Sequence, residues 1–271
     1  MKAPEIPDDE TYRLDALHSL DILDTPPDSD FDAVVALGRD LFDVPICLVS
    51  IVDADRQWFK ACIGLDVLET ARSVSFCGHA ILSQEPLVVL DATKDERFFD
   101  NPLVTGGPEI RFYAGSPIRL PSGYQVGTVC LIDRVPRAEF GDRDVKRLQM
   151  LAELAVTAMA VRGMRGELDT ARATADRLRA ALHLVPTPVA LADIAGKIEE
   201  ANPAFGVLCR SPEIDGGDVV DLLAVSEEDW SKAADVSDGE IRTGTDGKLL
   251  RVVQDPGGSI LVAKPEGKHE A

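Results

Sequence analysis

The sequence predicts an α+β protein with two antiparallel-sheet domains joined by a long coiled-coil helix. Three observations lead to this fold class. Two pairs of apolar, strand-like segments occupy the first half of the chain, an apolar heptad repeat fills residues 141–185, and short strand-like segments return after residue 186. A chain of 271 residues, 45% of them apolar, is long enough to bury a core in each of two domains.

The composition is strongly acidic, which argues against one class of partner. The sequence has 47 Asp and Glu residues against 28 Lys and Arg residues, a net charge of −19. Because nucleic-acid binding depends on Lys and Arg contacts with phosphates, we expect no nucleic-acid partner. The amino terminus lacks an apolar signal segment and no run of about 18 apolar residues occurs, which predicts a cytoplasmic protein without a membrane partner. The five cysteines form no CxxC pair, so we expect reduced thiols and no metal site.

Two helices are expected after an acidic leader at residues 1–9. The first is a short amphipathic helix within residues 11–25, and Pro26 and Pro27 stop it. The second covers residues 29–42, with Ser29 or Asp30 as its N-cap. Its predicted buried stripe consists of Phe31, Val34, Leu37, Leu41 and Phe42.

Two β-hairpins are expected to form the first sheet. The first hairpin covers residues 45–65 and turns at Asp53-Ala54-Asp55, and the second covers residues 110–133 and turns at Pro121-Ser122-Gly123. Some fifty residues lie between the two hairpins, including a strand at residues 86–92 and a polar loop. A long insertion over an antiparallel sheet is where a ligand site is expected.

A single long helix is predicted for residues 141–185. Its apolar residues repeat every seven positions, with a second series three positions later, as in a coiled coil. Such a helix would reach about 60 Å, and we expect it to pair with a second copy of the chain. Packing of the same heptads on their own domain is the alternative. The dimer seam is predicted at Leu154, Val161, Met164, Leu168, Leu178 and Leu182.

The second domain is predicted at residues 186–265, because Pro186 and Pro188 end the long helix. A strand, a turn at Gly196 and a second strand lead to a helix with Asn202 as its N-cap. Three further strands are expected, with turns at Asp246-Gly247 and Pro256-Gly257-Gly258, followed by a polar tail at residues 266–271.

Several separated motifs resemble those of a known family. The stretches "RLDALHSLDILDTPPDSDFDAV", "ETARSVSFCGHAIL" and "LVVLDATKDERFFDNPLV" occur in the order found in bacterial GAF domains, and the resemblance covers residues 10–162. The stretch "VALADIAGKIEEANPAF" resembles the opening of a PAS domain, which would fill residues 186–265. These resemblances imply a sensor of signal transduction in which the long helix connects the two domains.

Cys77 and His79 stand two apart at what looks like a helix start. A catalytic cysteine needs a base held by a third group, and a metal needs three or four ligands; neither set is apparent around Cys77. We therefore expect this segment to form a pocket wall, with a redox-sensing thiol or covalent cofactor attachment as alternatives. The predicted ligand-binding residues are Trp58, Phe76, Cys77, His79, Asp91, Phe99, Arg111, Phe112 and Tyr113. The sequence identifies neither the ligand nor a cofactor.

The expected function is that of a non-enzymatic sensor or adaptor. A small ligand or a redox change at the GAF-like domain would be relayed through a dimeric helix to the PAS-like domain and to an output protein such as a kinase, a cyclase or a regulator. Two alternatives stay open. The chain could be the sensory fragment of a cyclase or of a two-component histidine kinase, or a small redox enzyme centred on Cys77. No kinase, cyclase or hydrolase motif is recognised.

Overall fold

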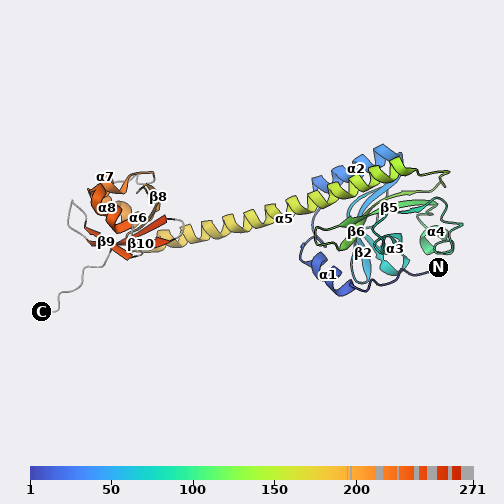
Figure 1. Ribbon diagram of the computed structural model, residues 1–271, viewed down its shortest axis with the longest axis horizontal. Helices are drawn as coiled ribbons and strands as arrows, with labels where there is room; N and C mark the ends of the chain where they lie inside the picture. The colour runs from blue at the N-terminus through green and yellow to red at the C-terminus, as the bar shows by residue number, and fades with distance from the viewer. Residues whose placement is uncertain are drawn as a thin grey trace. The chain divides into compact units, whose positions relative to one another are not determined.

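The structure is a computed structural model that describes residues 1–193, 195, 197–210, 216–224, 226–234, 238–242, 249–255 and 258–263. The chain divides into two units, Met1–Glu167 and Leu168–Ala271. Each unit contains one antiparallel sheet, as Figure 1 shows.

The sheet of the first unit has the strand order β3-β2-β1-β6-β5-β4. Its strands are β1 (Ile46–Val52), β2 (Arg56–Ile63), β3 (Glu69–Ala71), β4 (Leu87–Val89), β5 (Phe112–Arg119) and β6 (Gln125–Asp133). Strands β1 and β2 pair through the turn at residues 53–55, and β5 and β6 pair through the turn at residues 120–124, so both predicted hairpins are confirmed. The pairing of β1 with β6 joins the two hairpins edge to edge.

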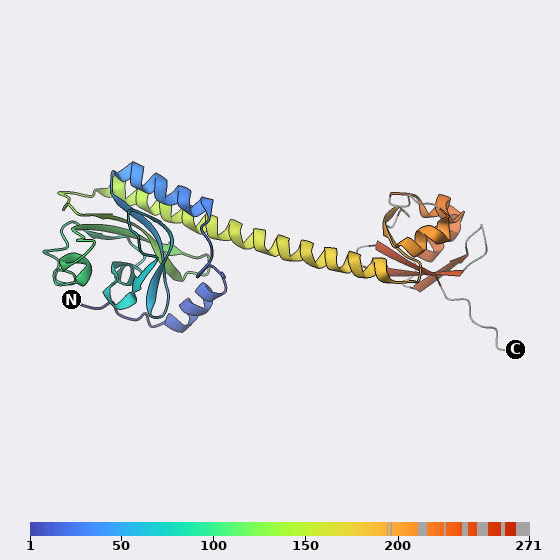
Figure 2. The same cartoon turned by 180° about the vertical axis from the view of Figure 1, so that it is seen from behind.

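Helices cover both faces of this sheet, and a separate core fills each face (Figures 1 and 2). On one face, α2 (Ser29–Phe42) and the first turns of α5 (Asp142–Leu184) pack on residues such as Val49 and Leu131. On the other face lie the short helices η1 (Arg72–Val74), α3 (Phe76–Ala80) and α4 (Pro102–Thr105).

The first predicted helix is shorter than expected. Helix α1 extends only from Glu10 to His18. Asp21 and Asp24 follow with φ angles of 46° and 57°, and this left-handed backbone cannot continue a right-handed helix. Leu17 of α1 still joins the core beneath α2.

Two details of α2 differ from the prediction. Its N-cap is Asp28, whose carboxylate accepts a hydrogen bond from the Asp30 backbone N–H. Leu37 and Leu41 are 49% and 40% exposed, because the face that meets the sheet is formed by other residues at helical spacing. The buried residues of α2 are Phe31, Val34, Val35, Gly38 and Phe42.

Helix α5 is continuous over 43 residues, as the sequence predicts for residues 141–185. Its buried residues, from Leu148 to Met159, face the core shared with α2. Of the predicted seam, Leu154, Met164, Leu168 and Leu178 are exposed, and Val161 and Leu182 are half-buried. None of the helices in the described part of the chain is long and apolar enough to cross a membrane.

The second unit contains a sheet with the strand order β8-β7-β11-β10-β9 among the described residues. Its elements are β7 (Val189–Ala192), β8 (Ile198–Ala201), α6 (Pro203–Cys209), α7 (Val219–Leu223), α8 (Glu227–Ala234), β9 (Asp238–Arg242), β10 (Leu249–Asp255) and β11 (Gly258–Ala263). Sequence reasoning did not foresee α7 and α8. The predicted turns at Gly196, Asp246-Gly247 and Pro256-Gly257, and the tail at residues 266–271, lie outside the described residues.

Asn202 is the N-cap of α6, as predicted, and it also contacts the end of α5. Its side-chain oxygen accepts hydrogen bonds from the backbone N–H groups of Val189 and Phe205, at 3.0 and 2.9 Å. Its side-chain nitrogen donates to the backbone carbonyls of Val185 and Thr187, at 3.0 and 2.7 Å. This buried amide therefore links the residues that follow α5 to the start of the second sheet.

Candidate functional site

A cavity of about 370 Å³ lies on the first sheet, on the face that carries α3 and α4. The strands form its floor, and α3, α4 and the loops after β2 and α4 form its walls. Its lining consists of Leu48, Gln57, Phe59, Leu65, Asp66, Val67, Thr70, Phe76, Cys77, Leu103, Gly107, Pro108, Ile110, Tyr113 and Ile132. A cavity of this size and apolar character is typical of small-molecule sites.

The alternation of side chains along β2 and β5 decides which aromatic residues reach the cavity. Phe59 and Tyr113 line it, whereas their neighbours Trp58 and Phe112 belong to the core on the α2 face. Successive residues of a strand point to opposite faces. The prediction therefore placed Trp58 and Phe112 on the wrong side of the sheet, while Phe76, Cys77 and Tyr113 line the cavity.

Four further predicted ligand-binding residues lie outside the lining. His79 points away from Cys77, because two residues on a helix diverge, and its Nε2 lies 3.0 Å from the Lys2 carbonyl oxygen. Asp91 pairs with Lys94 at 2.7 Å, and Phe99 is exposed. Arg111 donates hydrogen bonds to the backbone carbonyls of Val104, in α4, and of Ile110, and it does not line the cavity.

Phe76 of α3 forms an aromatic part of the cavity wall, and Phe98, which the sequence analysis did not select, packs behind it. The Phe76 ring stacks on Phe98, with centroids 3.9 Å apart, and lies 5.1 Å from the Tyr113 ring. Ser75 caps α3 by accepting a hydrogen bond from the Gly78 backbone N–H at 2.9 Å. Asn101 donates to the Val74 carbonyl of η1 at 2.9 Å and caps α4, so that one side chain joins η1 to α4.

Cys77, which lines the cavity, contacts Cys130 of β6, which lies outside the lining. The sulfur atoms of Cys77 and Cys130 are 3.8 Å apart, and the Tyr113 hydroxyl donates to the Cys77 sulfur at 3.5 Å. The Cys130 thiol beside it lowers the pKa of Cys77, against the opposing effect of burial, while the pKa of Cys130 is raised by the same contact. Cys77 lines the cavity and Cys130 does not, so Cys77 is the member of the pair that a molecule in the cavity contacts first. The sequence separates these two cysteines by more than fifty residues, and they meet because α3, which carries Cys77, packs on β6, which carries Cys130.

The polar part of the lining lies on β2 and β3. Gln57 and Thr70 are cross-strand partners, and the Gln57 side-chain nitrogen donates to the Thr70 hydroxyl at 2.7 Å. The Gln57 Oε1 is buried and has no hydrogen-bond partner among the residues that the structure describes. Sequence reasoning missed Gln57, although its position beside Trp58 on a strand places it on the opposite face from that ring.

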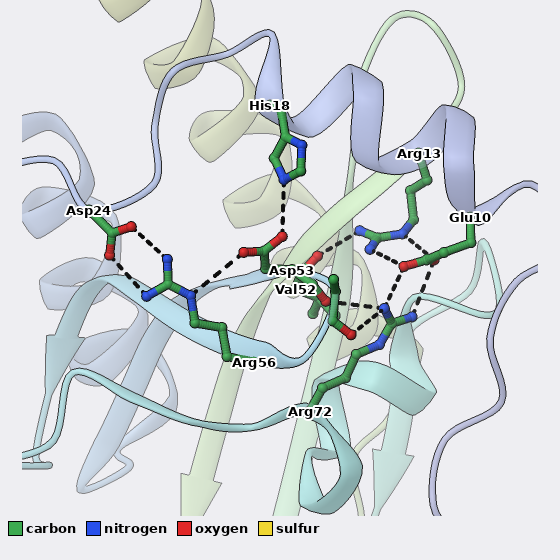
Figure 3. Close-up of polar contacts among 9 residues, drawn as sticks. Glu10, Arg13, His18, Asp24, Val52, Asp53, Arg56 and Arg72 are labelled. Atoms are coloured by element: carbon green, nitrogen blue, oxygen red, sulfur yellow. Dashed lines mark hydrogen bonds and ion pairs between the residues drawn. The ribbon is translucent and has the colours of Figure 1, made fainter.

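A polar network fixes the segment that leads into α3 (Figure 3). The Glu10 carboxylate accepts hydrogen bonds from Arg13 at 2.8 Å and from Arg72 at 2.5 and 3.2 Å. Arg13 also donates to the Val52 carbonyl, and Arg72 to the Asp53 carbonyl. Because Arg72 lies in η1, directly before α3, the network connects α1 to one wall of the cavity. No sequence pattern indicated this network.

Among the described residues, no group of three or more His, Cys, Asp or Glu side chains is placed to hold a metal ion.

The first unit is an α+β domain with a six-stranded antiparallel sheet that helices cover on both faces, and comparison with protein families identifies its family. Residues 26–159 match the GAF domain family, and residues 176–242 match a PAS domain family. The chain therefore contains a GAF domain followed by a PAS domain, and α5 extends from the end of the first match into the start of the second.

Three similar proteins were compared with the chain. A cyclic di-GMP phosphodiesterase of Pseudomonas aeruginosa is 41% identical over 179 residues, which is 66% of this chain and 30% of that protein. The Escherichia coli DhaR(N)–DhaL complex gives a TM-score of 0.52 at 13% identity, covering 97% of this chain and 92% of that chain, and this likeness concerns the fold alone. The GAF domain of an Acinetobacter phosphoenolpyruvate-protein phosphotransferase gives a TM-score of 0.42 at 19% identity, over 58% of this chain and 98% of that chain.

Proposed function

We propose that this chain senses a small organic molecule through its GAF domain. The observation that carries the proposal is the cavity of about 370 Å³, which has apolar walls and an unpaired buried acceptor. Ligand sites in proteins combine these two features, because apolar walls supply affinity and a few polar groups fix orientation. The GAF and PAS domains support a role in signal transduction.

Contacts within the first unit offer a route from the cavity to α5. The wall at α3 is held through Arg72 to Glu10 of α1. Beyond α1, the Asp21 carbonyl accepts a hydrogen bond from Arg162 of α5 at 2.8 Å, and Asp30 of α2 pairs with Arg165 at 2.9 Å. A ligand shifts this set of contacts only if it binds two arrangements of the wall with different affinity.

In this proposal, α5 pairs with the α5 of a second copy and relays the shift to the PAS domain. The exposed apolar side chains Leu154, Met164, Leu168 and Leu178 support a paired helix, because they leave apolar surface in water at the spacing of a seam.

The output is proposed to be a signalling enzyme or regulator. The 41% identity to part of a cyclic di-GMP phosphodiesterase supports turnover of that nucleotide as the controlled activity. The chain spans 30% of the length of that relative. In this proposal, the matching part of the chain is the sensory segment that controls the output. A histidine kinase or a cyclase as the controlled protein is the alternative.

The sensing proposal is tested by identifying the small molecules that copurify with the chain. Native protein would be denatured and its released molecules identified by mass spectrometry. Val67 lines the cavity and is 49% exposed, so Val67→Trp would block the opening without disturbing the core. Leu68→Trp is the matched control, because Leu68 is exposed and does not line the cavity. We expect the molecule in the wild type and in Leu68→Trp and its loss from Val67→Trp; equal recovery from all three would contradict the proposal.

Redox sensing is a second candidate, which the distance of 3.8 Å between the Cys77 and Cys130 sulfur atoms favours. A peroxide that enters the cavity would be attacked by the Cys77 thiolate, breaking the O–O bond and giving a sulfenic acid and one water. The Cys130 thiol would then attack that sulfur, forming a disulfide and releasing a second water. The sulfur atoms would have to approach to about 2.05 Å for this bond.

A further inference from the structure

The cavity contains no basic side chain. Among the described residues that line it, none is Lys, Arg or His, and the one ionisable carboxylate is Asp66. Asp66 is exposed and lies in the loop between β2 and β3 beside Val67, where the cavity meets solvent. Burial of an anion here would remove its hydration without a cation to compensate, which is strongly unfavourable.

Two arginines near the cavity are already engaged. Arg111 donates to the carbonyls of Val104 and Ile110, at 2.9 and 3.2 Å. Arg134 donates to the Pro108 carbonyl at 3.0 Å. These guanidinium groups hold the loop after α4 from outside the lining, so a phosphate in the cavity has neither as its partner.

Gln57 contributes a buried polar side chain to the cavity lining. The residue is 5% exposed, and its amide nitrogen is committed to Thr70. Its Oε1 is a buried acceptor without a partner, and a buried acceptor left unpaired is costly unless a ligand or a water supplies a donor. A ligand that carries an N–H group meets this requirement.

We infer that the GAF cavity selects a heteroaromatic molecule that is neutral or positively charged and that donates an N–H to Gln57 Oε1, and that it rejects phosphate- and carboxylate-bearing ligands. This inference rests on the proposed function, since it specifies the ligand class of the same cavity. Phe59, Phe76 and Tyr113 provide aromatic surfaces for a flat ring system, and the volume of about 370 Å³ accommodates two fused rings with a substituent.

Two matched pairs of probes test the two parts of the inference on the full chain. Indole and 1-methylindole share a ring system, but only indole donates an N–H. Tryptamine and indole-3-acetate carry opposite charges on that ring system. Dissociation constants would be measured by ligand-observed NMR, with cyclic GMP as a phosphate-bearing probe. We expect indole to bind about three- to tenfold more tightly than 1-methylindole, the worth of one hydrogen bond.

Substitutions of Gln57 and Asp66 test whether these two residues cause the preference for an N–H donor and the preference for positive charge. Gln57→Leu should bring the affinities for indole and 1-methylindole to within about twofold, and Gln57→Met provides a second apolar substitution if the first fails to fold. Ser50→Ala is the control, because Ser50 is buried on the same sheet but does not line the cavity, and it should leave the preference unchanged. Asp66→Asn should reduce an expected preference of about fivefold for tryptamine over indole-3-acetate. Asp55→Asn is the control, because Asp55 is an exposed carboxylate outside the lining, and it should leave the preference for tryptamine unchanged.

The outcomes separate this inference from the proposed function. Equal binding of indole and 1-methylindole to the wild type overturns the role of Gln57. Binding of cyclic GMP or indole-3-acetate as tight as that of tryptamine overturns the charge selection, and in both cases the cavity still binds ligands. If no probe binds and nothing copurifies, the cavity is not a ligand site, and the proposed function fails together with the inference.

Discussion

Glu10 accepts hydrogen bonds from two arginines whose side chains are almost fully buried. Partial burial acts to raise the pKa of Glu10, but its hydrogen bonds with Arg13 and Arg72 outweigh this effect and lower the pKa from 4.5 to about 2. Without this carboxylate, two guanidinium groups would remain buried with only backbone carbonyls as partners. Loss of one partner from such a buried group of charges is strongly destabilising.

We predict that Glu10→Gln lowers the free energy of unfolding of the GAF domain by about 3 kcal/mol at neutral pH. Because the pKa of Glu10 is lowered on folding, its contribution is complete above pH 4.5 and is lost as the pH falls towards about 2. The difference between wild type and variant should therefore shrink over that interval. Urea denaturation at a series of pH values measures it. Glu5→Gln, at an exposed pair with Lys2, is the control and should change stability little.

For the cysteine pair, we predict that dilute hydrogen peroxide forms a Cys77–Cys130 disulfide, with a loss of about 2 Da from the intact mass. Cys130→Ser should stop the reaction at a sulfenic acid on Cys77, a gain of about 16 Da that a dimedone label reveals. Cys47 should not react, because burial raises the pKa of its thiol to about 12. Oxidation of Cys209 or Cys62 by peroxide before Cys77 would rule out redox sensing at the Cys77–Cys130 pair.

At the scale of elements, α5 leaves apolar side chains exposed beyond the core that it shares with α2. Leu168 is 49% exposed and belongs to the predicted seam. Ala173, also exposed, is five residues further along the helix and outside the seam.

If α5 pairs with a second copy, a charge at a seam position should disrupt the dimer. We predict that Leu168→Glu weakens dimerisation at least about tenfold, whereas Ala173→Glu, which adds the same charge off the seam, changes it less than about twofold. Light scattering across a concentration series from 1 to 100 µM measures the mass. A wild-type chain that stays monomeric throughout would contradict the paired helix.

The elements that a pattern of apolar residues defines could be predicted from the sequence, whereas contacts between distant segments could not. Both hairpins, α2 and α5 follow from local apolar spacing and turn residues. The stripe of α2 was partly misassigned because Leu37 lies on the same half of the helix as Val34 but at its exposed edge. In the site, the sequence analysis selected Trp58, but strand alternation places Gln57 and Phe59 in the cavity lining and Trp58 in the core on the other face. The approach of Cys77 to Cys130 depends on how α3 lies over β6, which no local pattern determines.

At the scale of the whole molecule, the net charge of −19 opposes association of two copies. At about 0.01 M salt the Debye length is about 30 Å, so charges repel across most of a domain, whereas at 0.1 M salt it is about 10 Å. We predict that the dimer affinity increases when sodium chloride is raised from 10 to 200 mM. Sedimentation equilibrium at both salt concentrations measures it, and a dimer that weakens with salt would indicate that ion pairs, and not apolar contacts, hold the copies together.

The Asn202 amide uses both of its polar atoms at the end of α5, and this has a mechanical consequence. One side chain receives hydrogen bonds from the first residue of β7 and the first turn of α6, and gives them to the two carbonyls that follow the helix. Any twist at the carboxy-terminal end of α5 must then either break these bonds or turn β7 and α6 by the same amount. The four hydrogen bonds of this one side chain therefore couple the residues that follow α5 to β7 and α6.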